Sequence, residues 1–360
     1  MKRAVLFVLF LLFWWGLFGV VCHGEELPLP DIPLPEALTE YLGSPESDTQ
    51  ALYGWLDSDK AFGFAKKSFS DTLSVTLSAF FSLLSVTALT AVIEAMSWGV
   101  ANKGIAVSVG YLSVLCGASA LLETLRGLVQ LISGHLKTLG TFASGVIPVY
   151  VGICTASGMG GLGTTSGTGL ALCASFASLL AEKVLLPLLC VCFLLDFCSS
   201  VSAQGGITAI SMTVRRFFVG MVGCVGALLT AVFAFQTRIA AKADTLAGRT
   251  VRYVAQTALP FVGGALSEAS RTLSASFSLM GGVVGGMGVV AVVFLMLPVL
   301  LRLWLFRLCL MASDGIARVL SCHRLASLYR DSAALVGALM AVTALVDAVL
   351  IFEFGLIFSL

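Results

Sequence analysis

The chain has 360 residues, of which 58% are hydrophobic and only 11% are charged, and its net charge is +1. A soluble domain carries about 25% charged residues, so this chain has too few charges to give a globule of its size a polar surface. A nearly neutral chain also has no overall electrostatic attraction to nucleic acid. The composition therefore predicts an all-α polytopic membrane protein that does not bind nucleic acid.

The N-terminus has the pattern of a secretory signal. Two basic residues precede an apolar run over 4–21, and small residues at Cys22 and Gly24 fit a cleavage site that follows them. We therefore expect residues 1–24 to be a signal peptide. The same run is also long enough to remain in the membrane as an uncleaved anchor, so that alternative stays open.

Residues 25–68 differ sharply from the rest of the chain. Between Glu25 and Asp59 there are nine acidic residues, several prolines and no Lys or Arg. Proline favours extended backbone, which predicts an acidic linker outside the cytoplasm. From Tyr53 to Phe69, aromatic residues are mixed with three lysines, a pattern typical of a short amphipathic helix at a membrane surface.

Residues 69–360 form the predicted polytopic domain. A helix needs about 20 apolar residues to cross about 30 Å of hydrocarbon. About seven segments are candidates: Leu73–Trp98, Ile105–Leu122, Phe142–Thr155, Leu170–Phe197, Phe217–Phe235, Leu279–Leu301 and Ala334–Leu356. Amphipathic, interfacial helices are expected between them at Glu123–Lys137, Arg238–Arg252 and Arg318–Asp331.

The orientation of these segments is ambiguous. Basic residues cluster over 238–252 and again over 302–330, and the positive-inside rule assigns both clusters to the cytoplasm. Only one clear span separates them. A further crossing or a re-entrant piece within Ala258–Phe277, where Pro260 begins a break, would resolve the conflict.

The stretch GMGGLGTTSGTG at 158–169 contains G-x-G-x-x-G at Gly158, Gly160 and Gly163, and an acid follows at Glu182. A dinucleotide loop needs a strand before it and a helix after it, whereas the flanking runs here have the length of membrane spans. We therefore expect a flexible hairpin or re-entrant break whose glycines supply backbone freedom only.

A second group of glycines has a different spacing. Gly281 and Gly285, and likewise Gly282 and Gly286, are four residues apart within one apolar run. This spacing lets two helix backbones approach closely. It predicts a packed helix face, either against another helix of the chain or against a different subunit.

Several ionisable residues fall within the apolar runs. Glu182, Lys183 and Asp347 are the candidates for intramembrane charges, because a charge at the bilayer centre costs about 2.5–3.5 kcal/mol and needs a partner, a cavity or an interface. Others are interpreted more simply. Glu94, Asp196 and Glu353 are read as charges near span ends, and His135 and His323 as interfacial residues.

Residues with enzyme chemistry do not form a recognisable pattern. The ten cysteines contain no C-x-x-C pair, there are only three histidines, and no H-E-x-x-H or Ser, His and Asp arrangement occurs. We therefore predict no catalytic residue, no metal and no cofactor.

The segment Arg215–Arg271 carries the most specific signal. After an apolar span it has Arg249-Thr250, Tyr253, Pro260 and Gly263 in an order that resembles the stage III sporulation protein AE family of endospore-forming bacteria. A Pro-Val turn at Pro148 also fits. The resemblance extends from about residue 69 to the C-terminus.

The resemblance implies a membrane subunit of a channel or secretion-like complex that connects the mother cell and forespore after engulfment. It implies a multi-pass location in the mother-cell membrane around the forespore. The implied partners are the other proteins of the stage III sporulation A operon, a forespore membrane protein and the lipid bilayer. A stand-alone secondary transporter that uses Glu182, Lys183 and Asp347 at the midplane is the alternative.

Overall fold

The computed structural model describes residues 58–97, 103–156, 159–202, 205–258 and 263–359. Regular structure in these residues is helical, as the composition predicts. The helices are α4 (Ser58–Ser97), α5 (Lys103–Ala156), α6 (Gly160–Leu179), the π-helical η1 (Leu180–Leu185), α7 (Leu186–Ser202), α8 (Gly205–Ala258), α9 (Gly263–Val319) and α10 (His323–Ser359).

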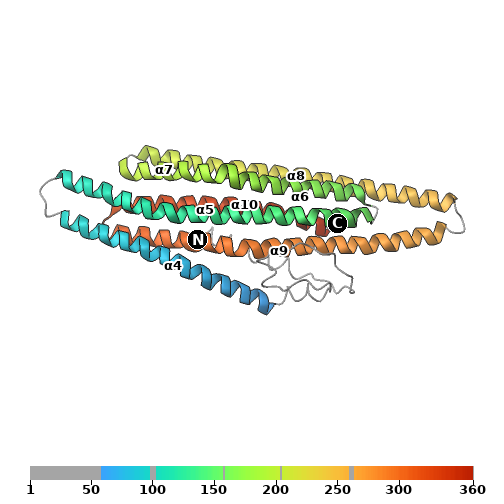
Figure 1. Cartoon of the computed structure of the whole chain (residues 1–360). Helices are drawn as coiled ribbons and strands as arrows, with labels where there is room; N and C mark the ends of the chain where they lie inside the picture. The colour runs from blue at the N-terminus through green and yellow to red at the C-terminus, as the bar shows by residue number, and fades with distance from the viewer. Residues whose placement is uncertain (1–57, 98–102, 157–158, 203–204, 259–262, 360) are drawn as a thin grey trace.

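The helices form an elongated bundle with nearly parallel axes, and the chain reverses direction at each turn (Figure 1). α9 and α10 pack along each other, as do α5 and α6, while α4 lies against α9 and α5. α5 has 54 residues, which corresponds to about 80 Å of helix. This length exceeds the hydrocarbon core of about 30 Å, so the longest helices extend well beyond one bilayer thickness.

Five helices in the described part of the chain are long and apolar enough to cross a membrane. They contain the segments Lys66–Ile93, Gly110–Ala156, Ala209–Ile239, Val284–Val319 and His323–Ile357, and a shorter apolar segment covers Cys190–Ser200. The expected count of about seven is therefore not reproduced. Two expected spans, 105–122 and 142–155, lie on the single helix α5, and the expected span Leu170–Phe197 is divided among α6, η1 and α7, where only the shorter segment Cys190–Ser200 is apolar enough to be counted.

The reason for this difference is the stretch 123–137, which we expected to be a separate interfacial helix. Its outer face is polar, but Leu125, Leu128, Ile132 and Leu136 on its inner face are buried. These residues follow the helical period, and they continue the buried face of α5 through the polar stretch. No residue there ends the helix, so α5 runs on unbroken.

The N-terminal predictions fall largely outside the described residues. This applies to the signal peptide at 1–24 and to the linker up to residue 57. The described remainder of the amphipathic segment, 58–68, is the first part of α4, which continues without a break into the first apolar run. The expected boundary between residues 68 and 69 therefore lies inside a helix.

Two expected breaks are also absent where the structure can be described. α9 is continuous from Gly263 to Val319, so 263–277 is its first part and not a re-entrant piece. Pro148 lies inside α5 and not in a turn, and α9 contains Pro298 in the same way. Transmembrane helices tolerate prolines in this way, because neighbouring groups can satisfy the backbone carbonyl that loses its amide partner.

The glycine-rich stretch after α5 is mostly helical, contrary to the expectation of a flexible hairpin. The chain does reverse there, and the amide of Met159 donates to the carbonyl of Cys154 at 2.8 Å. From Gly160 onward, however, the residues belong to α6. Because a helix, α5, precedes it, the stretch lacks the strand that a dinucleotide loop requires.

Close packing between α5 and α6 explains Gly163 and Gly167 better than backbone freedom does, while Gly158 lies outside the described residues. A Cβ atom on Gly163 would lie 2.6 Å from the Cβ of Cys154, and one on Gly167 would lie 2.9 Å from Val151 Cγ2. Gly160, by contrast, has open space around its Cα. The four-residue spacing of Gly163 and Gly167 places both on one face of α6, where any side chain would push α5 away.

Candidate functional site

Buried polar side chains gather at two levels of the bundle. The first group, named here the arginine cluster, consists of Asp196 on α7, Ser211 and Arg215 on α8, and Asp331 on α10. Arg215 Nη1 donates to Asp196 Oδ2 at 3.1 Å and to the carbonyl oxygen of Asp331 at 2.6 Å, and Ser211 donates to Asp196 Oδ1 at 2.6 Å. One guanidinium therefore joins three helices.

The arginine cluster is almost completely enclosed. Asp196 is 0% exposed and Arg215 is 4% exposed, and Arg215 Nη2 has no hydrogen-bond partner among the described residues. Burial of a charge is costly unless the charge is paired and hydrogen-bonded. The two hydrogen bonds from Arg215 and the one from Ser211 meet most of this requirement, so the cluster fixes the relative position of α7, α8 and α10.

The second group is centred on α10. His135 of α5 and Asp347 of α10 are both buried, and His135 Nε2 lies 2.8 Å from Asp347 Oδ1. The other carboxylate oxygen, Oδ2, has no hydrogen-bond partner in the described part of the chain. This pair links α5 to α10, and it leaves one acceptor oxygen of Asp347 without a hydrogen-bond partner among the described residues.

Glu353 lies almost two turns further along α10. It is 3% exposed, and its Oε1 atom also lacks a hydrogen-bond partner within the described residues. Gly169 of α6 makes room for it, because a Cβ there would lie 3.4 Å from Glu353 Oε2 and 3.3 Å from Phe233 Cδ1 of α8. Two carboxyl groups of α10 therefore occupy the interior between α5, α6 and α8.

The predicted intramembrane charges have different surroundings. Asp347 is 0% exposed and paired with His135, whereas Lys183 is exposed. Glu182 and Lys183 belong to the π-helical segment η1, a geometry that often occurs at functional sites. Pro187 explains this segment, because it lacks the amide hydrogen that would bond to the carbonyl of Lys183 in an α-helix. The structure does not bring Lys183 together with Asp347.

Sequence reasoning missed Arg215 and Asp331. Asp196 and Glu353, interpreted as charges near span ends, lie close to the ends of the apolar segments Cys190–Ser200 and His323–Ile357, and the structure adds that both are buried. His135 is buried, contrary to its interpretation as interfacial, because it lies on the same face as Ile132 and Leu139. That three- and four-residue spacing was the available signal. For Arg215 and Asp331 the sequence offers no comparable signal, since their contact joins positions 116 residues apart.

The predicted glycine face lies within α9. Gly285 is buried and Gly286 is partly buried, while the surroundings of Gly281 and Gly282 fall outside the description. Gly288, three residues after Gly285, is where α9 and α10 approach each other most closely among the described glycines of α9. A Cβ there would collide with the ring of Phe354 on α10. This ring also lies 5.7 Å from that of Phe142 on α5, measured between centroids.

Comparison with known proteins identifies the family. A profile of the family described as stage III sporulation protein AE matches residues 56–359. The chain belongs to the stage III sporulation protein AE family. This membership carries a role in sporulation, and the long apolar helices indicate a membrane protein.

A curated member of the stage III sporulation protein AE family, from Bacillus subtilis (strain 168), is 21% identical over 265 residues. The aligned segment covers 71% of this chain and 65% of that relative, so it spans less than two thirds of the relative's length. No solved structure matches the 360-residue chain described here.

The motif that resembles the stage III sporulation protein AE family lies where α8 and α9 extend beyond the other helices (Figure 1). Arg249, Thr250 and Tyr253 belong to the last part of α8, and Gly263 is the first residue of α9. Pro260 falls outside the described residues. Arg249 and Thr250 are exposed, which makes this extension of the bundle available for contact with other molecules.

Proposed function

We propose that this chain is a membrane subunit of the channel or secretion-like complex that connects mother cell and forespore, and that forespore development after engulfment requires it. The family match over residues 56–359 carries this proposal. Two properties of the bundle support it. Several of its helices can cross a bilayer, and the exposed extension of α8 and α9 offers a contact surface for the other proteins encoded with it.

The test is deletion of the gene in the bacterium that produces this protein. We expect engulfment to be completed and forespore development to stop afterwards, as followed by membrane-dye microscopy and counts of heat-resistant spores. Full-length protein should restore spores, and an affinity tag on it should recover the other subunits from sporulating cells. Normal spore counts after deletion would contradict the proposal.

The two α10 carboxyl groups favour a second candidate, a secondary transporter that acts alone. Glu353 and Asp347 each keep a buried oxygen without a partner among the described residues, and such oxygens can hold a proton or a cation. This candidate requires uptake by the purified protein in liposomes, and loss of uptake in Glu353→Gln but not in Asp71→Asn, which changes an exposed carboxylate. Absence of uptake would leave the channel subunit as the only candidate.

A further inference from the structure

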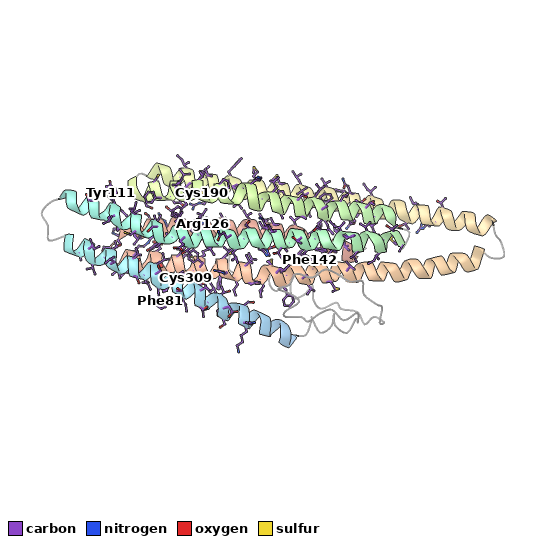
Figure 2. The ribbon with its side chains drawn as sticks, in the orientation of Figure 1. Phe81, Tyr111, Arg126, Phe142, Cys190 and Cys309 are labelled. Carbon is purple, nitrogen blue, oxygen red and sulfur yellow. The ribbon has the colours of Figure 1, made fainter. Side chains whose placement is uncertain are left out.

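The outer face of α5 is polar along its central part. Exposed residues recur there at spacings of three and four, so they form one stripe along the helix. The stripe, named here the α5 polar face, contains Glu123, Arg126, Gln130, Gly134, Lys137 and Thr141. Arg126 is labelled in Figure 2. The opposite side of α5 is the buried leucine-rich face that packs into the bundle.

Contacts between the helices place this face at the same depth as the middle of α8. His135 of α5 meets Asp347 of α10. Leu345, two residues before Asp347 on α10, has its Cδ1 atom 3.7 Å from the position that a Cβ on Gly223 of α8 would take. α5, α8 and α10 all run in the same direction along the bundle (Figure 1). The level of His135 therefore corresponds to the level of Gly223 and its neighbour Cys224.

At that level α8 presents an apolar outer face. Phe217 is 72% exposed, Leu228 is 60% exposed and Phe235 is 71% exposed. The segment that contains them is bounded by the exposed residues Arg216 and Arg238. The residues between these arginines extend over about 30 Å of helix, which matches the hydrocarbon thickness of a bilayer. The outer face of α8 therefore fits contact with lipid.

The α5 polar face does not fit contact with lipid at the same depth. An Arg at the bilayer centre costs about 2.5–3.5 kcal/mol, and Arg126 and Gln130 are exposed within or at the edge of this layer. Thr141 is weaker evidence against lipid contact than the charged and amide side chains are. Its hydroxyl donates to the carbonyl oxygen of Lys137 at 3.0 Å, so its own helix satisfies it. The charged and amide side chains therefore require water or protein in front of α5.

We propose that the α5 polar face lines a water-filled passage that this chain encloses together with further copies of itself, while α8 faces lipid. The polar face occupies one side of the bundle only, so a single chain cannot surround a passage. Repetition of the chain about an axis supplies the remaining walls. Glu123 and Arg126 carry opposite charges and remain hydrated in such a passage, which suits ions and small polar solutes. This inference rests on the proposed channel role.

The experiment compares two thiols at one depth. Gly134→Cys places a thiol on the polar face, and it should fold normally because a Cβ there has no neighbour within 4 Å. Cys224, an exposed natural cysteine of α8, is the control. The probe is a positively charged methanethiosulfonate. The thiolate attacks its sulfenyl sulfur, forms a mixed disulfide and releases methanesulfinate, a reaction that requires water to ionise the thiol.

In membranes from sporulating cells, we expect peptide mass spectrometry to show at least tenfold faster modification at Gly134→Cys than at Cys224. A bifunctional thiol reagent should also link two copies of the Gly134→Cys protein. Equal rates at the two thiols, or protection of both, would overturn the passage. A crosslink to a different protein in place of a second copy would overturn the role of self-association.

The outcome is separable from that of the proposed function. Normal spore counts in the deletion strain would contradict the channel role, whereas slow modification of Gly134→Cys in a strain that needs the protein would contradict the passage alone. As a second variant, Gly134→Trp should narrow the passage. We expect it to reduce spore counts at unchanged protein abundance, and Gly127→Trp, which also enters open space at the edge of the layer, should reduce them less.

Discussion

At the scale of single residues, charges inside this bundle depend on one or two neighbours. The Arg215 guanidinium has Asp196 and a carbonyl oxygen, and Asp347 has His135. Loss of one partner leaves the other buried without compensation, which is more costly than replacement of both by apolar groups. Substitution of one member of such a pair is therefore expected to lower stability more than replacement of both members by apolar residues does.

His135→Leu and Asp347→Leu test this expectation. Because each single change removes one side of a buried contact, we expect each to lower the free energy of unfolding by about 3 kcal/mol. The double variant should lose clearly less than the sum of the two. Thermal unfolding in detergent measures these changes.

The matched control for that cycle is an exposed pair. Arg318 Nε lies 2.7 Å from Asp314 Oδ1, and half of the Arg318 side chain is exposed. Arg318→Ala should therefore change stability far less than His135→Leu does, because an exposed ion pair contributes little. Additive effects of His135→Leu and Asp347→Leu would show that the two side chains do not interact.

At the scale of helices, small residues set how closely neighbours approach. Gly163 and Gly167 let α6 lie against α5, and Gly288 lets α9 lie against Phe354 of α10. Because lipid tails are as apolar as leucine, such contacts depend on close packing and not on hydrophobic exclusion from water. Added atoms at these positions therefore separate helices that otherwise touch.

Gly163→Leu should destabilise the contact between α5 and α6 by about 1–3 kcal/mol or more, as expected for overpacking of a tight site. Gly160→Leu is the control on the same helix, because open space surrounds Gly160, and it should be nearly neutral. Thermal stability in detergent distinguishes the two. Equal effects of both substitutions would mean that α6 does not approach α5 at Gly163.

Gly288→Ala should also lower stability, because its methyl group would collide with the ring of Phe354. A second change, Phe354→Leu, removes the ring and should restore part of the loss. The measured quantity is again the unfolding midpoint. Gly285→Leu, at a buried glycine of the same helix, should retain membrane targeting while it lowers the stability or the recovery of partner subunits.

At the scale of the whole molecule, successive long helices alternate in direction, with α6, η1 and α7 running together in one direction, so the turns fall at two opposite ends of the bundle (Figure 1). Met159 lies at one end, and Ser321, the turn residue between α9 and α10 with a φ of 65°, lies at the other. A bilayer that crosses the bundle must lie between these two ends.

Gly160→Cys and Ser321→Cys should therefore react from opposite sides of the membrane. We expect an impermeant thiol reagent to modify only one of them in sealed vesicles and the other only in inverted vesicles. Peptide mass spectrometry gives the sidedness of each position. Reaction of both from the same side would show that an even number of crossings separates them.

Composition and the order of a few residues were sufficient to predict the class of structure and the family. Low charge content and long apolar runs allow only helices that satisfy their own backbone hydrogen bonds, and the order of residues from Arg249 to Gly263 indicated the family that the profile match shows. The buried face of α5 was also readable, because Leu125, Ile132 and Leu136 repeat with the helical period.

Where the helices continue and which charges meet depends on packing between segments that are distant in the sequence. The polar stretch 123–137 looked like a boundary, but the neighbouring helices bury its inner face and keep α5 whole. His135 meets Asp347 across 212 residues of sequence. Such a contact leaves no local pattern, because helical periodicity fixes the face on which a side chain lies but not the helix that packs against it.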